Sequence, residues 1–259
     1  MKFPRSAFAA TILAASLCGC AAANDADVAK AVEPSLRMAA LTAEASNDYK
    51  GAAQHWQTLY QHHPEDKGIA LSLARALRYG GSPAQGADVM QASLVRFGRD
   101  ADVLTELGKD YLADQRIPLA LKYLDEARTL APTRWDIPSA IGVSLDSQRR
   151  FADAAAAYAQ ALTLSPDNPE ILNNLGLSQA LSGKLDDGIA TLRHANDQPA
   201  ADAQVRQNLA MLLALKGDAE DAEALARHDL PPDLARANSQ IFHDLAKAVG
   251  HPAPPADGG

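Results

Sequence analysis

Cysteine is almost missing from this 259-residue chain, and its two cysteines lie close to the N-terminus. Cys18 and Cys20 leave everything that follows without a thiol. A disulfide framework or a thiolate metal site needs several cysteines distributed through the fold. The sequence therefore excludes both kinds of site from the body of the protein.

Aromatic side chains are also scarce, at 5% of the residues, although 47% of the chain is hydrophobic. No stretch shows the alternation of polar with β-branched or aromatic residues that is typical of strands. Alanine dominates instead, and it is the strongest helix former and permits close contact between helices. The composition therefore predicts an all-α protein.

Positive charge is in deficit, and the formal net charge of the chain is −8. A protein that binds nucleic acid through its phosphates presents a basic face. We therefore expect no nucleic-acid partner.

Motifs for catalysis, for cofactors and for metal ions are missing as well. No serine lies in a nucleophile-elbow motif, and no glycine-rich phosphate loop is present. The seven histidines include no His-Glu-x-x-His pair, and the adjacent His62 and His63 fall in a turn between repeats. We therefore expect no enzyme, no cofactor, no metal ion and no small-molecule substrate.

The N-terminus has the pattern of a short secretion signal. Lys2 and Arg5 precede an apolar run over residues 7–17, which is too short to span a membrane. The run ends in Leu-Cys-Gly-Cys, which resembles the signal of bacterial lipoproteins, where a cysteine is lipidated after cleavage. This predicts a signal peptide over 1–19, lipidation of Cys20 and a flexible tether over 20–32. An ordinary secretory signal is the alternative.

The residue after the lipidated cysteine indicates the membrane. Lipoproteins retained at the inner membrane commonly carry aspartate there, whereas this chain has Ala21. By this resemblance we expect a lipid anchor in the outer membrane, with the protein facing the periplasm.

The rest of the chain repeats with a period of 34 residues, and small residues recur at two positions of each repeat. At the eighth position they are Ala40, Ala74, Gly108, Gly142, Gly176 and Ala210. At the twentieth position they are Ala52, Gly86, Ala120, Ala154, Gly188 and Ala222. Such a pattern is typical of stacked helix–turn–helix units, and it resembles the tetratricopeptide repeat (TPR).

This resemblance predicts a right-handed α-solenoid of six helix pairs over residues 33–236. The six units are 33–66, 67–100, 101–134, 135–168, 169–202 and 203–236. Gly81, Gly183 and Gly217 are expected in the turn between the two helices of their units.

An additional helix is expected to cap the array at its C-terminal end, over residues 233–249. Leu234 and Ile241 lie on one apolar stripe of this segment. The Pro- and Gly-rich residues 250–259 are expected to form a disordered tail.

The first helix of each tetratricopeptide unit lines the concave face, so inward-facing residues follow from their positions. In the fifth and sixth units these positions place amides beside apolar side chains: Asn173, Asn174, Leu177, Leu181, Gln207, Asn208 and Met211. Amides can pair with the backbone of an extended peptide, and apolar neighbours can hold its side chains. We expect these seven residues to form a peptide-binding groove. The alternative is that the amides are solvated and the leucines pack against the capping helix.

A second interpretation of the concave face is a clamp for a C-terminal carboxylate. Arg75, Arg78 and Lys109 supply cations to it. Acidic residues interrupt these cations along the face, which favours solvated helix surfaces over a clamp.

The end of the repeat region carries a more specific resemblance. Its motifs are Asn-Asn-Leu-Gly-Leu-Ser at 173–178, Asp-Ala-Gln-Val-Arg-Gln-Asn-Leu-Ala at 202–210, Leu-Lys-Gly-Asp at 215–218 and Asp-Leu-Pro-Pro at 229–232. Together with the lipoprotein signal and six units, they make the chain similar to the TadD family, the lipoproteins of the tight-adherence (Tad, Flp) pilus assembly system. The distinctive part of the resemblance covers about residues 170–240.

The TadD resemblance implies a scaffold that assists assembly of the pilus secretion machinery, with its secretin or another pilus component as partner. One alternative is a pilotin for the secretin of a type IV pilus. Another is an outer-membrane regulator of a cell-wall enzyme or of the barrel-assembly complex.

Overall fold

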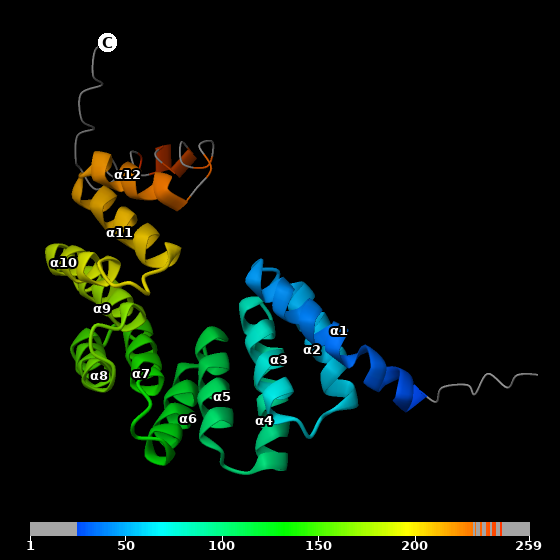
Figure 1. The fold of residues 1–259 in the computed structure, drawn as a ribbon. Coiled ribbons are helices and arrows are strands. Elements are labelled where there is room, and N and C mark those ends of the chain that lie inside the picture. Colours follow the sequence, from blue (N-terminus) through cyan, green and yellow to red (C-terminus); the bar gives the residue numbers. More distant parts are fainter. Residues whose placement is uncertain are drawn as a thin grey trace, which may run out of the picture.

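The computed structural model describes residues 25–229 and the positions 231, 234, 237, 238, 240, 241 and 244. Twelve helices and no strand are found in this part of the chain. They are α1 (Asp25–Ala45), α2 (Tyr49–His62), α3 (Lys67–Tyr79), α4 (Pro83–Phe97), α5 (Ala101–Ala113), α6 (Ile117–Leu130), α7 (Asp136–Ser147), α8 (Phe151–Leu164), α9 (Pro169–Leu181), α10 (Leu185–Asn196), α11 (Ala203–Lys216) and α12 (Ala219–Asp229). Figure 1 shows them as antiparallel pairs stacked into a curved array. The all-helical solenoid expected from the repeat is confirmed.

An Asx residue at the end of the preceding unit starts most of the first helices. Asp66, Asp100, Asn168 and Asp202 are the N-caps of α3, α5, α9 and α11. Each side chain accepts a hydrogen bond from a backbone N–H in the first turn of its helix. Because a capped N–H stabilises the helix start, these residues fix the phase of the units.

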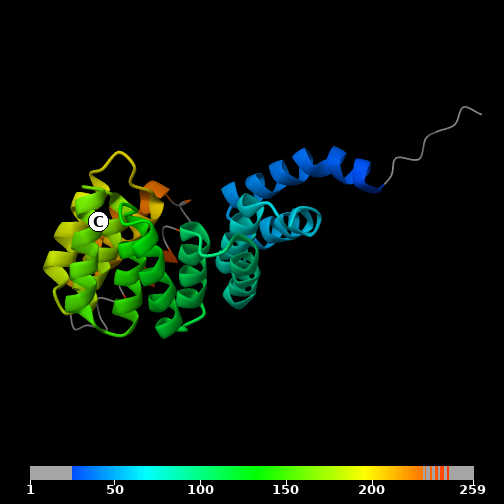
Figure 2. The same cartoon turned by 90° about the horizontal axis from the view of Figure 1, so that it is seen from below.

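The first helix begins within the segment that was expected to be a flexible tether. α1 begins at Asp25, so residues 25–32 are helical and the tether predicted over 20–32 is wrong for that part. The segment is rich in alanine, which favours a helix. Pro34 lies inside α1. Figure 2 shows the N-terminal half of α1 extending beyond the stack.

The turn inside each unit is the same in all six repeats. The residue at the fifteenth position has a positive φ in every unit: Asn47, Gly81, Gln115, Arg149, Gly183 and Gly217. The three predicted glycines are therefore in the turn, and three other units place a side chain in the same left-handed conformation. That conformation costs a non-glycine residue about 1–2 kcal/mol.

The small residues of the repeat lie where a large side chain from the partner helix rests on them. A Cβ added to Gly142 would lie 2.5 Å from the ring of Tyr158, and one added to Gly108 would lie 2.6 Å from Leu124. Both side chains occupy the twenty-fourth position of their units and are fully buried. In these two units the helix pair is therefore held by a large side chain seated on a residue that has no side chain.

Neighbouring units share their cores. Ile69 and Leu73 of α3 pack in one cluster with Trp56 and Leu59 of α2. The corresponding contacts recur between α4 and α5, α6 and α7, α8 and α9, and α10 and α11. Stacking therefore buries the second helix of each unit against the first helix of the next.

Several predicted segments lie outside the described residues. They are the signal peptide 1–19 with Cys20, most of the capping helix over 233–249, and the tail 250–259. The positions that are described between 233 and 249 are helical, and Leu234 and Ile241 are exposed there.

Replacing Gln115 with glycine should stabilise the protein. Relief of the left-handed strain exceeds the backbone entropy that glycine adds to the unfolded chain, so the free energy of unfolding should rise by about 0.5–1 kcal/mol. The reciprocal change, Gly183→Ala, should lower it by about 1 kcal/mol. Urea unfolding followed by circular dichroism measures both. A loss of stability in Gln115→Gly would show that the turn does not strain its side chain.

Candidate peptide-binding groove

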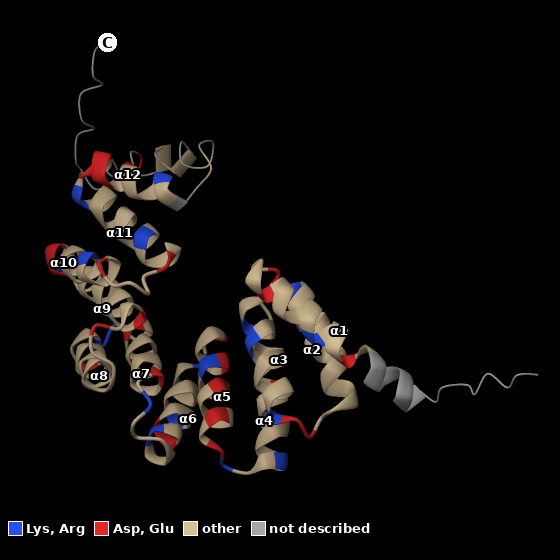
Figure 3. Cartoon of the chain, in the orientation of Figure 1, with Lys and Arg blue, Asp and Glu red and all other residues tan. Residues whose placement is uncertain are grey.

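The first helices of successive units form the concave face. α3 contacts α5, α5 contacts α7, α7 contacts α9 and α9 contacts α11. The second helices of neighbouring units make no comparable contacts within the described residues. The inner surface of the curve is therefore built from α3, α5, α7, α9 and α11. Figure 3 marks the acidic and basic residues along the ribbons and shows both kinds on α5.

A chain of ion pairs joins the units across this face. Arg78 donates to Glu106 and to Asp110 at 2.6 Å each, and its side chain is 9% exposed. Lys109 lies 3.0 Å from Asp136. Two of the three cations considered above for a carboxylate clamp are therefore paired with carboxylates of the chain itself, and Arg78 is buried rather than solvated.

Further along the chain of ion pairs, Arg134 contacts Asp102 at 2.6 Å and Asp136 at 2.8 Å. Lys67 contacts Asp100 at 2.8 Å and Asp102 at 2.9 Å. Carboxylates of the third and fourth units are thus paired with cations that the chain itself supplies.

Asp110 is the most deeply buried carboxyl group of this network. Its side chain is fully buried, and its Oδ2 atom has no hydrogen-bond partner. The space for it is left by Gly86, where an added Cβ would lie 3.0 Å from the carboxyl group. Burial raises the pKa of Asp110 to about 7, although Arg78 opposes the shift. Burial also acts on Glu106, but Arg78 and Lys109 hold the pKa of that group below its usual value.

The predicted amides form a ladder between units. Asn208 donates to Asn173 at 2.8 Å, Asn173 donates to Asn174 at 3.4 Å, and Asn174 donates to Ser139 at 3.4 Å. Asn173 is buried, so its amide is largely used inside the protein. The ladder connects α7, α9 and α11.

The remaining predicted residues divide between the core and the surface. Leu177 and Met211 are half-buried against the core of the last two units. Leu181 is 64% exposed, and Gln207 is half-buried.

A cavity of about 570 Å³ opens on the concave face beside Asn173 and Asn174. The other residues that line it are Tyr79, Trp135, Asn168, Pro169, Glu170, Ala200, Asp202, Gln204 and Val205. The other five predicted residues lie outside it. Glu170 and Gln204 were missed, although both occupy the second position of their units, which faces the concave side. A smaller cavity adjoins it and shares Tyr79, Trp135 and Glu170.

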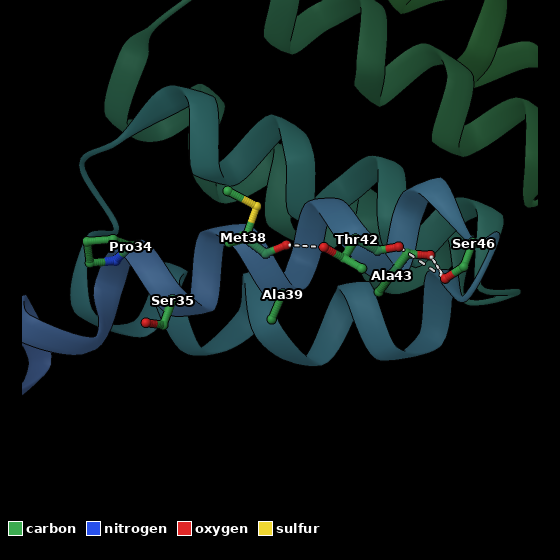
Figure 4. A pocket seen from close by; sticks show the side chains of 7 residues that line it. All are labelled: Pro34, Ser35, Met38, Ala39, Thr42, Ala43 and Ser46. Carbon is green, nitrogen blue, oxygen red and sulfur yellow. Dashed lines mark hydrogen bonds between the residues drawn. The ribbon is translucent and has the colours of Figure 1, made fainter.

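A second open surface lies on α1, the first helix of the array in the part of the chain that the structure describes. A shallow groove of about 670 Å³ runs along it, lined by Pro34, Ser35, Met38, Ala39, Thr42, Ala43 and Ser46 (Figure 4). The hydroxyl groups of Thr42 and Ser46 donate to backbone carbonyls of α1, at 2.9 and 3.0 Å. Their donor hydrogens are used within the helix, and the other lining side chains are mostly small and apolar.

Within the described residues, no three histidine, cysteine, aspartate or glutamate side chains come close enough to hold a metal ion. No helix in that part of the chain is both long and apolar enough to cross a bilayer.

The buried carboxyl group makes stability depend on pH. Between about pH 4 and pH 7 the folded chain keeps the Asp110 proton that the unfolded chain has released, so the free energy of unfolding should fall as pH rises through this window. Compared with Asp110→Asn, the wild type should lose on the order of 2–4 kcal/mol between pH 5 and pH 8. Urea titrations at several pH values measure this difference. The exposed Asp187→Asn is the control, and an equal slope in both variants would contradict the assignment.

Comparison with known proteins agrees with this architecture. The sequence profile of the tetratricopeptide repeat matches residues 37–101, 71–134 and 139–203. A search of curated protein sequences finds no match.

Solved structures show the same fold. A TPR protein of Thermus thermophilus is 22% identical, with a TM-score of 0.64, over 70% of this chain and 98% of that one. PilF of Pseudomonas aeruginosa is 16% identical, with a TM-score of 0.54, over 83% and 99%. MamA of Desulfovibrio magneticus is 16% identical, with a TM-score of 0.50, over 68% and 96%. The profile spans more than half of the sequence, and the chain belongs to the tetratricopeptide repeat family.

Proposed function

We propose that this protein is a non-catalytic scaffold, anchored in the outer membrane by a lipid on Cys20, that assists assembly of the Tad (Flp) pilus secretion machinery. The repeats make it a protein-binding protein. The role in pilus assembly is supported by the sequence resemblance of residues 170–240 to the TadD lipoproteins. The partner in this proposal is the secretin or another pilus component, held on the concave face.

One observation carries the proposal: the open concave cavity is built mainly from the stretch that carries the family resemblance. Most of its lining residues lie between Asn168 and Val205, on α9 and around the start of α11. The earlier units, whose sequence motifs are generic, carry ion pairs on their concave face, and only a smaller cavity opens beside these pairs. A surface that the chain leaves open is the one that a partner can use.

The proposed anchor places the solenoid near the bilayer. α1 begins at Asp25, close in sequence to Cys20. The residues between them reach about 20 Å at most when extended.

Replacing Cys20 with serine should release the protein from the membrane without unfolding it, because the anchor is outside the repeats. Fractionation of cells should find the variant in the soluble periplasmic extract, with an unchanged circular dichroism spectrum after purification. Cys18→Ser is the matched control and should stay with the membrane. A Cys20→Ser protein that remains membrane-bound would contradict lipidation at this residue.

A photo-crosslinking residue in place of Gln204 should capture the partner in cells. The same residue in place of Gln160, which is exposed on α8 of the convex side, is the control. Mass spectrometry should identify a pilus secretin or another pilus component only from the Gln204 position. Capture of a type IV secretin would favour the pilotin alternative. Capture of a cell-wall synthase or a barrel-assembly subunit would overturn the pilus proposal.

A further inference from the structure

Three carboxylates occupy the second position of successive units on the concave face, and they differ in their partners. Asp102 lies 2.9 Å from Lys67, and Asp136 lies 2.8 Å from Arg134. Glu170, the next in the series, has no ion pair within the described part of the chain. The chain thus supplies a cation to Asp102 and to Asp136 but none to Glu170.

The cavity beside Glu170 has an unbalanced charge. Glu170 and Asp202 both line it, and no lysine or arginine does. Burial raises the pKa of Glu170, Lys109 opposes the shift, and Asp136 and Asp202 reinforce it. Glu170 also lines the adjoining cavity, whose cations are Arg75, Arg78, Lys109 and Arg134, and the last three of these are paired with other carboxylates of the chain. Within the larger cavity, a cation would be attracted by both Glu170 and Asp202.

Two aromatic side chains line the same cavity as the carboxylates. Trp135 is half-buried at the start of α7, and Tyr79 is 61% exposed at the end of α3. Within the described residues, a cation of the chain lies over each of five aromatic rings: those of Trp56, Tyr79, Tyr111, Tyr123 and Phe151. No such cation lies over Trp135, although indole is the aromatic ring that binds a cation best.

We propose that this cavity binds a lysine or arginine side chain of the partner segment, with the cationic head at Glu170 and Asp202 and the aliphatic stem along Trp135. The inference rests on the proposed function, because it names the side chain that the concave face selects. Stems of lysine and arginine pack on apolar surface while their heads keep polar contacts. Charge-assisted hydrogen bonds to the two carboxylates would orient the head.

Other side chains fit the cavity less well. An acidic side chain would be repelled by Glu170 and Asp202. An apolar side chain would cover Glu170 without offering it a partner, and burying an unpaired carboxylate is costly. The amides of Asn174 and Gln204 at the edge of the cavity can pair with the backbone of the segment, and they do not distinguish side chains.

The test uses the full mature lipoprotein in detergent and a displayed library of random peptides of about a dozen residues. Peptides selected by the wild type should be enriched in lysine or arginine at one position. The double variant Glu170→Gln with Asp202→Asn should bind these peptides about 10–100-fold more weakly, because the charge-assisted contacts are lost. Asparagine at 202 still caps α11, so the variant keeps the helix start. Its circular dichroism spectrum should match that of the wild type.

The double variant Asp187→Asn with Glu220→Gln is the matched control, because it removes the same charge from exposed positions outside the cavity. It should select the same basic peptides with unchanged affinity. Selection of peptides without lysine or arginine, no selection at all, or equal binding by the cavity variant would overturn the inference. A pilus component captured from Gln204 that binds the cavity variant normally would leave the proposed function intact. Selection of basic peptides without capture of a pilus component would support the inference about the cavity and count against the proposed pilus function.

Discussion

The structure depends on one contact that the third, fourth and fifth units share, a large side chain of the second helix seated on a glycine of the first. Where the side chain is large the fit is tight: an added Cβ at Gly142 would come within 2.5 Å of Tyr158, and one at Gly176 would come within 2.8 Å of Leu192. The contact fixes the separation and rotation of the two helices, since neither ring nor branched side chain can move aside in a packed core. With each pair fixed, every unit presents the same docking face to the next, and the curvature of the array follows.

That regular stacking also organises the polar groups. Equivalent positions of adjacent units lie side by side on the concave face, so hydrogen bonds join residues about one period apart. Asn208 to Asn173 and Ser178 to Asp146 are examples, at 2.8 and 2.7 Å. A polar residue at an inward position is therefore placed beside its counterpart in the next unit. If the two side chains can pair with each other, their polar groups are used within the protein. If they cannot pair, their polar groups stay available to a ligand.

Much of this could be predicted from the sequence because it repeats. The small columns, the helix pairs and the turn glycines follow from one period, since each unit faces the same packing problem. The left-handed Gln115 and Arg149 were not predicted, because neither residue type signals that conformation. The start of α1 was missed because a short alanine-rich segment fits a tether as well as a helix. The cavity was missed in part because it joins Tyr79 of α3 to residues of α9, and that proximity depends on the curvature of the stack, which the period does not specify.

The same physics explains why the open site lies in the later units. In the second and third units Arg78 is enclosed by Glu106 and Asp110, so its charge is already satisfied and a ligand would have to displace a buried pair. Breaking such a pair leaves an uncompensated charge, which is strongly destabilising. Glu170 has no such partner and keeps its exposure to solvent, so a ligand cation meets it without displacing anything. A repeat protein can thus form a specific site where one unit lacks the cation that pairs with the equivalent carboxylate in the preceding units. Here Asp102 and Asp136 have such cations and Glu170 has none among the described residues.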